Sequence, residues 1–427
     1  MAKKEKYRPR IADRLLARKL QGKGAVLLEG AKWCGKTTTA KQISKSVLYM
    51  TEPGRVVQNL ELARLNPLLL LRGAKPRLID EWQVAPQLWD AVRFEADRSD
   101  SLGLFILTGS SVPPDMSGVM HSGTGRFAWM KMRPMSLWES GESSGEVSMA
   151  SLFDGNLDIA GYSEVDLEQI AFVACRGGWP LAVSMNGDVA LDQAFDYISA
   201  VEHRDIQLAD GVMRDSARVH RLLRSYARHQ GTQAPNSVIR ADLIENEGEA
   251  LDVDTVASYI RALERIFVIE DAAAWNPNLR SKTAIRTSDT RYFTDPSIAT
   301  AALGIGPSDL IADLETFGLI FETLCMRDLR VYAEPISGTV YHYRDKNGLE
   351  CDAVVHLRDG RYGLVEIKLG GDKLISEGAS TLLSLAGKID TERMKAPSFM
   401  MVLTAVGNYA YRREDGVLVV PVSCLKD

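Results

Sequence analysis

Long apolar runs are absent from this sequence: no stretch approaches the about 18 consecutive apolar residues that a membrane-spanning helix requires. The N-terminus also lacks the apolar core of a secretory signal, because Lys3, Lys4, Lys6, Arg8 and Arg10 lead into an amphipathic stretch. These absences argue against a membrane protein and against a secreted one. We therefore expect a cytoplasmic location and no membrane partner.

Cysteine is scarce and irregularly spaced. The five cysteines are Cys34, Cys175, Cys325, Cys351 and Cys424. An odd number at these separations fits neither a disulfide framework nor the ligand spacing of a zinc site. The pattern is typical of a reduced compartment.

A strong net charge is absent as well. The formal charge is −5, so any binding of nucleic acid must come from local basic patches. The N-terminal segment is one such patch, but a solvated tail followed by a helix packed on the first domain is the favoured explanation of its charges.

The chain has 427 residues, which is more than one hydrophobic core usually serves. Its patterning predicts an α/β core with a basic N-terminal segment over residues 1–160 and a helical extension over 161–212. A region of helices and a hairpin follows over 213–298, and a second α/β region covers 299–427. We expect each of these regions to contribute a separate part of the function.

A glycine loop gives the clearest chemical signal. It reads Gly30-Ala31-Lys32-Trp33-Cys34-Gly35-Lys36-Thr37 and is followed by Thr38. Two glycines separated by four residues and followed by Lys-Thr fit a phosphate-binding loop between a strand over 25–28 and a helix over 38–44. Lys36 would reach the β and γ phosphates of ATP, and Thr37 would hold Mg²⁺. Cys34 inside the loop predicts sensitivity to thiol oxidation.

An acidic pair follows the next predicted strand. Asp80 can orient the magnesium ion, and Glu81 is placed to polarise the water that attacks ATP. A solvated strand end would explain the pair in isolation, but its position after the glycine loop favours catalysis.

Three further residues are candidates for sensing or completing this site. Thr108 and Ser110 end a strand over 104–107, where they could contact the γ-phosphate or the attacking water, although a simple Gly-Ser turn is an equal alternative. Arg126 precedes a strand over 127–132. It is a candidate arginine finger, and a surface ion pair is the common alternative.

The middle of the chain carries a basic stripe. A helix over 215–230 places Arg218, Arg221, Arg224 and Arg228 broadly along one face. A second helix follows Asp254 as its N-cap, and an apolar hairpin ends near Trp275, which together indicate a winged helix-turn-helix. The arginines slightly favour contact with DNA phosphates over a scaffold role.

The last region contains a second constellation. A strand over 349–357 carries Asp352, and the next strand, over 364–369, carries Glu366 and Lys368 on one face. If hairpin pairing brings them together, the two carboxylates can hold a second Mg²⁺ or Mn²⁺ while Lys368 stabilises the charge of a phosphodiester reaction. Glu322, on a preceding helix over 314–328, would add an outer ligand. Ordinary surface ion pairs are the alternative.

These motifs, taken together, resemble a known group. They are similar to the motifs of bacterial and archaeal AAA+ ATPases with a C-terminal domain of the PD-(D/E)xK nuclease superfamily. The motifs that carry the resemblance are the loop 30–37, Asp80-Glu81-Trp82-Gln83, Leu107-Thr108-Gly109-Ser110-Ser111, Gly125-Arg126, Gly177-Gly178-Trp179-Pro180, Tyr343-Arg344-Asp345, Glu350-Cys351-Asp352 and Glu366-Ile367-Lys368. Cys351 and Trp82 depart from the usual aliphatic residues of that family.

The resemblance implies an α/β P-loop AAA+ core, a winged-helix middle and an α/β nuclease-like C-terminal domain. It also implies that Arg126 acts on a neighbouring subunit of a homo-oligomer. Two functions follow: an ATPase that acts on DNA and cuts it with a metal, or a nucleotide-driven switch that binds a protein partner through a silent nuclease fold. A signal-transduction ATPase is less favoured, because no repeat array for ligand sensing is present.

Overall fold

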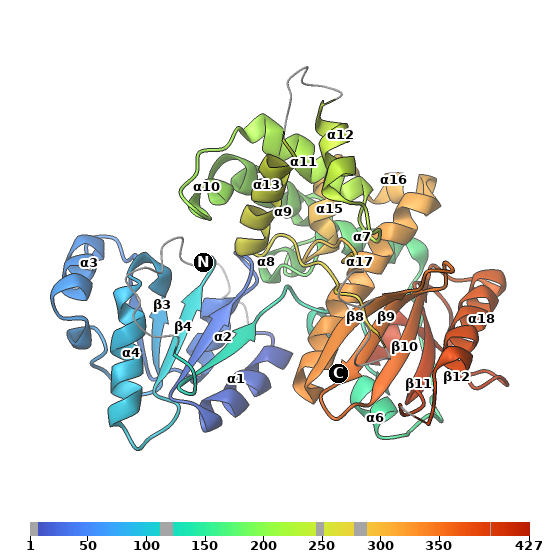
Figure 1. The fold of residues 1–427 in the computed structure, drawn as a ribbon, viewed down its shortest axis with the longest axis horizontal. Coiled ribbons are helices and arrows are strands. Elements are labelled where there is room, and N and C mark those ends of the chain that lie inside the picture. Colours follow the sequence, from blue (N-terminus) through green and yellow to red (C-terminus); the bar gives the residue numbers. More distant parts are fainter. Residues whose placement is uncertain (1–6, 112–122, 245–251, 277–287, 393) are drawn as a thin grey trace. The chain divides into compact units, whose positions relative to one another are not determined.

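The chain folds back on itself, so that residues far apart in sequence share a core. The computed structural model describes residues 7–111, 123–244, 252–276, 288–392 and 394–427 (Figure 1). Unit 1 combines Met1–Pro134, Ala200–Asp215 and Tyr259–Val268. Unit 2 combines Met135–Ser199, Ser216–Ser258 and Ile269–Asp427.

Unit 1 is built on a parallel sheet with the strand order β2-β3-β4-β1-β5. The strands are β1 (Ala25–Glu29), β2 (Ser46–Tyr49), β3 (Arg77–Asp80), β4 (Phe105–Gly109) and β5 (Phe127–Lys131). The predicted strands at 25–28, 104–107 and 127–132 are confirmed to within two residues. Because all the strands are parallel, their carboxyl ends meet at one edge, where ligands bind in sheets of this kind.

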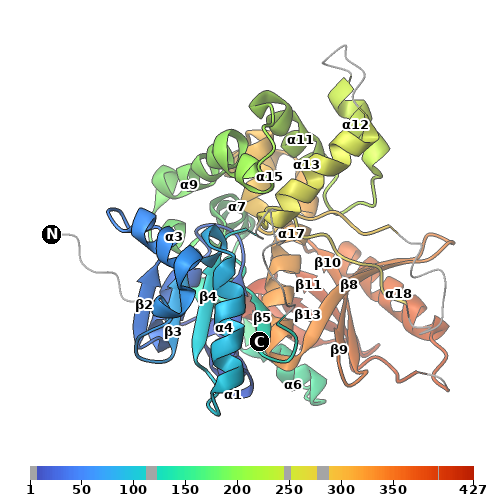
Figure 2. The ribbon, with the colours of Figure 1, turned by 60° about the vertical axis from the view of Figure 1, so that its left-hand side comes forward.

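Helices cover both faces of this sheet, and its central strands β1 and β4 are accordingly apolar except at their carboxyl ends. They are α1 (Ile11–Gly22), α2 (Lys36–Ile43), α3 (Val56–Leu65) and α4 (Gln87–Arg98), with short turns η1 (Pro67–Leu69) and η2 (Trp82–Val84). Figure 2 shows α4 along one face, where its Leu88 and Trp89 share a core with Ile79 and Leu107. The π-helical turn η3 (Val201–Asp205), α10 (Ile206–Leu208) and the segment Tyr259–Val268 also belong to unit 1.

Unit 2 contains a mixed sheet with the order β7-β12-β13-β11-β10-β9-β8. Its strands are β7 (Gly161–Tyr162), β8 (Gly338–Arg344), β9 (Glu350–Leu357), β10 (Tyr362–Lys368), β11 (Phe399–Thr404), β12 (Tyr409–Arg412) and β13 (Leu418–Pro421). β8, β9 and β10 pair antiparallel, whereas β10, β11 and β13 pair parallel, and α18 (Asp372–Lys388) connects β10 to β11. β6 (Val147–Ser148) and β14 (Leu425–Lys426) form a separate pair.

The remaining helices of unit 2 surround this sheet or form a helical part. They are α5 (Leu137–Ser140), α6 (Met149–Phe153), α7 (Leu167–Arg176), α8 (Pro180–Val183), α9 (Gly187–Ala200), α11 (Ser216–Arg228), α12 (Asn236–Ile244), α15 (Pro296–Leu303), α16 (Pro307–Ala312) and α17 (Leu314–Ala333), with turns η4 (Glu334–Ile336) and η5 (Val422–Cys424). α17 runs five residues beyond the predicted end at 328 because its last turn is still buried in the core.

The region predicted to be a winged helix contains α11, α12 and α13 (Val253–Arg265), and antiparallel bridges join Ile269 to Phe293 and Ala272 to Thr290. The prediction of Asp254 as an N-cap is wrong, because α13 already begins at Val253. The winged-helix assignment itself stays a prediction.

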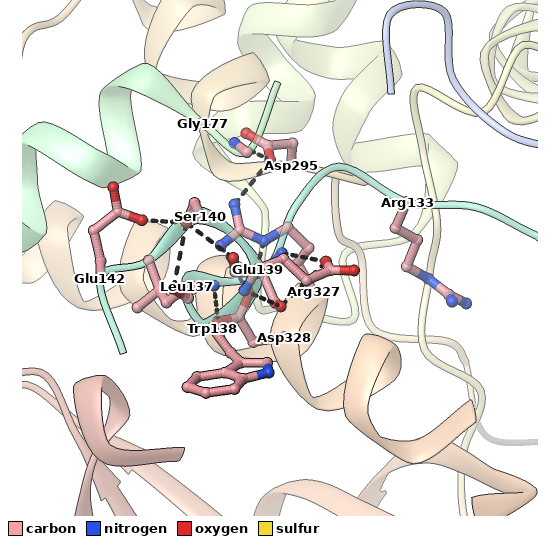
Figure 3. Close-up of polar contacts among 12 residues, drawn as sticks. Arg133, Leu137, Trp138, Glu139, Ser140, Glu142, Gly177, Asp295, Arg327 and Asp328 are labelled. Atoms are coloured by element: carbon pink, nitrogen blue, oxygen red, sulfur yellow. Dashed lines mark hydrogen bonds and ion pairs between the residues drawn. The ribbon is translucent and has the colours of Figure 1, made fainter. Parts of the chain in front are cut away.

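A buried ion-pair cluster holds separate segments of unit 2 together. The Arg327 guanidinium lies 2.9 Å from Asp295 and 2.8 Å from Asp328, and the side chains of both aspartates are fully buried (Figure 3). Asp328 also accepts a hydrogen bond from the backbone N–H of Leu137, and Asp295 accepts one from Gly178. Such a cluster is stable only when every carboxylate oxygen finds a donor, as here.

Candidate functional site

The glycine loop connects β1 to α2 and needs its glycines for two different reasons. Gly30 has φ +150°, and a Cβ there would lie 2.0 Å from the carbonyl oxygen of Met132. Gly35 has φ +103° immediately before α2. A side chain at either position would therefore distort the loop, whose N–H groups are suited to surround phosphates.

The residues of the loop divide into buried and exposed ones. Ala31 and Cys34 are fully buried, whereas Trp33 is half exposed. The Lys36 ammonium donates to the carbonyl oxygens of Gly30 at 2.8 Å and Ala31 at 2.7 Å. Lys36 is thus held directly over the loop, where a phosphate could replace these carbonyls as its partner.

Hydroxyl and carboxylate oxygens meet beside the loop. Thr37 Oγ1 donates to Asp80 Oδ1 at 2.7 Å, and Thr108 Oγ1 donates to the same oxygen at 2.6 Å. Asp80 and Thr108 are direct neighbours on β3 and β4. The structure therefore brings together three residues that the sequence singled out separately.

Glu81 follows Asp80 in an unusual backbone conformation. Its φ is +57°, a region that residues other than glycine rarely adopt and that is common at functional sites. The amide of Gln83 donates a hydrogen bond to Glu81 Oε2, whereas Gln83 Oε1 is buried without a hydrogen-bond partner among the described residues. In the sequence Gln83 belongs to a motif but carries no predicted role of its own.

Two contacts around the loop had no signal in the sequence. The buried Arg10 guanidinium donates to the carbonyl oxygens of Cys34 and Arg133, both at 2.9 Å, and so braces the loop from outside. Lys32 lies 2.5 Å from Asp205, which is distant in the sequence. Neither pairing follows from local spacing.

Ser110 and Arg126 lie at different edges of the sheet. Ser110 is buried just after β4, near the carboxyl ends of the strands. The backbone of Arg126 bonds to Ala25, where β1 begins, and its guanidinium pairs with Asp97. β1 has five residues, so the edge of the sheet at which it begins, beside Arg126, lies about 16 Å from the glycine loop that follows its other end. Arg126 therefore lies far from the glycine loop of its own chain, and its role as an arginine finger stays a prediction.

The predicted C-terminal constellation is assembled by β9 and β10. Lys368 Nζ lies 3.2 Å from Asp352 Oδ2 and 2.7 Å from Glu366 Oε2. Asp352 Oδ2 also accepts a hydrogen bond of 2.7 Å from the backbone N–H of Ile367. The predicted juxtaposition of these three side chains is confirmed.

Glu322 of α17 lies within electrostatic range of the same group. Tyr292 donates a hydrogen bond from its hydroxyl to Glu322, a contact that the sequence did not indicate. Burial and the charge of Asp352 raise the pKa of Glu322 well above its ordinary value. Burial and Asp352 likewise raise the pKa of Glu366 to about 8. Burial lowers the pKa of Lys368, but Asp352 and Glu366 outweigh it and the net shift is upward.

These residues do not present an open metal site. The Lys368 ammonium bridges Asp352 and Glu366, and so occupies the space that a cation shared by both carboxylates would need. Within the described residues, no group of three or more His, Cys, Asp and Glu side chains is arranged to hold a metal ion. The donor set in this arrangement therefore does not fit the second metal that the sequence predicted.

The arginines of α11 differ in exposure. Arg224 and Arg228 are exposed, whereas Arg218 and Arg221 are half-buried. Arg228 lies 3.7 Å from Asp242 of α12, and Asp242 also bonds to Ser225 and His229. Arg224 and Arg228 thus offer the accessible charges of the stripe.

Among the described helices, none has the length and apolar content to cross a bilayer.

Comparison with known proteins divides the chain into three matched regions. Residues 22–140 match the model of an AAA domain, residues 167–309 match a domain of unknown function (DUF8612), and residues 317–425 match another (DUF4143).

Two curated mycobacterial proteins match along the chain. Uncharacterized protein Rv2008c of Mycobacterium tuberculosis and uncharacterized protein Mb2031c of Mycobacterium bovis are each 24% identical over 418 residues, covering 96% of this chain and 83% of theirs. Among solved structures, the Walker-type ATPase PABY2304 of Pyrococcus abyssi matches with a TM-score of 0.40 and 16% identity, over 68% of this chain and 94% of that one. Residues 22–140 are thus similar to an AAA domain, and the two regions that follow are similar to domains of unknown function.

Proposed function

We propose that this protein binds ATP and hydrolyses it to ADP and phosphate at the carboxyl edge of the sheet in unit 1. The observation that carries the proposal is the convergence of Lys36, Thr37, Asp80 and Thr108 beside a glycine loop that has no room for a side chain at Gly30. The match of residues 22–140 to an AAA domain supports the same chemistry.

Each side chain has a distinct role in the proposed reaction. Lys36 would exchange its hydrogen bonds with the loop carbonyl oxygens for hydrogen bonds with the β and γ phosphates and stabilise the phosphate charge. Glu81 would accept the proton of the attacking water as the bond to the γ-phosphorus forms and the bond to the leaving oxygen breaks. Thr37 and Asp80 supply the hard oxygen donors that Mg²⁺ prefers, and such an ion would neutralise phosphate charge.

Two substitutions test the proposal. Lys36→Ala should abolish ATP binding, and Lys41→Ala on the same helix α2 should not, because Lys41 is exposed and away from the loop.

Glu81→Gln should retain ATP and lower kcat about 100-fold or more, the usual effect of losing a general base. Glu61→Gln, on the exposed face of α3, is its matched control. Normal turnover by Glu81→Gln would show that another group accepts the proton.

DNA is the proposed target of this ATPase, supported by the exposed arginines of α11. Arg224→Ala should weaken binding of DNA of any sequence and reduce the dependence of log Kd on log salt concentration by about one. Arg412→Ala, an exposed arginine of β12, is the control. Unchanged binding and salt dependence for Arg224→Ala would favour the alternative, a nucleotide-driven switch that binds a protein partner.

The C-terminal region is not proposed to cut DNA, because Lys368 bridges the carboxylates that would hold the metal. Labelled linear, single-stranded and branched DNA, incubated with Mg²⁺ or Mn²⁺ with and without ATP, decides the question. Cutting that vanishes in Asp352→Ala would establish a nuclease. Absence of cutting with retained DNA binding would favour a silent nuclease fold.

A further inference from the structure

The ion pair between Lys32 and Asp205 joins the phosphate loop to a distant segment of the same unit. Lys32 Nζ lies 2.5 Å from Asp205 Oδ1, and 173 positions separate the two residues in the sequence. Both belong to unit 1, which includes residues 200–215 although the chain before and after this segment belongs to unit 2. The contact is therefore a tertiary link made directly by a residue of the proposed ATP site.

Asp205 occupies an unusual local structure. It ends the π-helical turn η3, which interrupts the path from α9 to α10, and it is only 6% exposed. π-helical turns are rare and frequently lie at functional sites. A buried carboxylate needs a cation or several donors to remain charged, and the Lys32 ammonium supplies the cation here.

The segment around Asp205 is internally braced. Arg214 binds both oxygens of Asp210 at 2.7 Å, donates to the carbonyl oxygen of Ile206 and stacks on Tyr259. The contacts of Arg214 with Asp210 and with the Ile206 carbonyl oxygen together close residues 206–214, directly after Asp205, into one loop. A displacement of Asp205 would consequently move the segment as a whole rather than one side chain.

Lys32 is available to a second partner. Its side chain is 39% exposed, whereas that of Asp205 is 8% exposed, so solvent and ligands reach the pair from the side of the lysine. ATP bound in the loop would bring several negative charges beside the ammonium. The phosphates would attract the same ammonium as the buried carboxylate, so the two compete for it.

We propose that Asp205 is a positioning residue that holds the Lys32 side chain in the nucleotide-free loop. When ATP binds, the Lys32 ammonium pairs with its phosphates, the ion pair with Asp205 breaks, and the segment 200–215 is released. The inference rests on the proposed ATP site. It makes Asp205 the residue through which that segment senses nucleotide. Because both ends of the segment continue into unit 2, its release would report ATP binding to the rest of the chain.

Deuterium uptake by peptides covering residues 200–215 tests this link. The parent protein carries Glu81→Gln so that bound ATP persists, and Asp205→Asn and Lys32→Gln are added singly. In the parent, ATP should raise the exchange rate of these peptides about threefold, as expected for loss of a half-exposed ion pair. In both variants exchange should be raised without ATP, and ATP should add little. Arg204→Gln, in the same turn but exposed, should behave like the parent.

ATP affinity separates the two variants from each other. Asp205→Asn removes the competitor and should tighten ATP binding about threefold, whereas Lys32→Gln removes a phosphate partner and should weaken it. A general loss of folding would weaken binding in both. If Asp205→Asn exchanges and binds like the parent, the link is wrong and the ATP site stands. If the parent itself does not bind ATP, the proposed function fails and the inference with it.

Discussion

The carboxylate of Glu81, the proposed catalytic base, is held by the local backbone and by a neighbouring side chain. Its left-handed backbone directs the carboxylate toward Gln83, and the Gln83 amide then fixes one of its oxygens. Gln83→Ala should lower kcat about 10-fold while leaving ATP affinity unchanged, because the substitution removes a restraint on the base and no contact with phosphate. The measurement is steady-state ATP hydrolysis with a parallel binding titration.

Gln87→Ala, at the exposed start of α4, is the matched control for this change. A parallel loss of ATP affinity in Gln83→Ala would mean that Gln83 supports the loop itself. An unchanged kcat would remove the positioning role.

All five cysteines are buried, which argues against the expected oxidation sensitivity of the phosphate loop. Cys34 is fully buried, with its thiol against the Met132 carbonyl oxygen. Burial raises the pKa of Cys175 to about 12 and that of Cys424 to about 11, so neither forms much of the reactive thiolate at pH 8.

We therefore expect little reaction of the native protein with a thiol-specific disulfide reagent at pH 8. Five thiols should react after unfolding in denaturant, the number in the sequence. ATP hydrolysis should be the same with and without reductant. Rapid labelling of Cys34 in the native protein, located by peptide mass, would contradict this expectation.

At the scale of elements, the Arg327 cluster ties the start of α5, the Gly177-Gly178 turn and α15 to α17. Arg327→Met should lower the free energy of unfolding of unit 2 by about 3–5 kcal/mol, because it leaves two buried carboxylates without their cation. Chemical denaturation followed by tryptophan fluorescence measures the change, since Trp179 is buried in this unit.

Arg344→Met is the matched control, because Arg344 pairs with Glu350 on the surface, where both side chains are about half exposed. It should change the free energy of unfolding by less than about 1 kcal/mol. Equal effects of the two substitutions would mean that the buried cluster contributes no more than a surface pair.

The sequence predicts those elements that follow local rules. The glycine loop, the strand ending at Asp80 and the hairpin carrying Asp352 and Glu366 rest on spacing and alternation, and the structure has them. Asp205, Arg10 and Tyr292 act through tertiary contacts with partners far along the chain, and no local pattern indicates such contacts. The bridging position of Lys368 could not be predicted either, since alternation gives the face of a side chain but not its partner.

At the scale of the whole molecule, the place of Arg126 at the opposite edge of the sheet allows a test of assembly. Lys36→Ala and Arg126→Ala should each be inactive alone. Mixed in equal amounts, they should recover about a quarter of native ATP hydrolysis, because half the loops are intact and half of their neighbours carry the arginine.

Subunit exchange must precede the assay, so the two variants are mixed after dissociation at low concentration. A mixture of Lys36→Ala with Glu81→Gln is the control and should recover no hydrolysis. Each loop uses the Glu81 of its own subunit, so every site in this mixture carries one of the two substitutions. No recovery in the first mixture, with exchange verified by mass, would remove Arg126 as a finger acting between subunits.

The interleaving of the two units bears on how the protein is made. The segment 22–140 that matches an AAA domain leaves the ribosome early, yet unit 1 also needs residues 200–215 and 259–268. Unit 1 therefore stays incomplete, with part of its surface uncovered, while more than a hundred further residues are synthesised. Unit 1 cannot be complete until two segments of unit 2, 135–199 and 216–258, have also been made, and no single cut in the gene would release it whole.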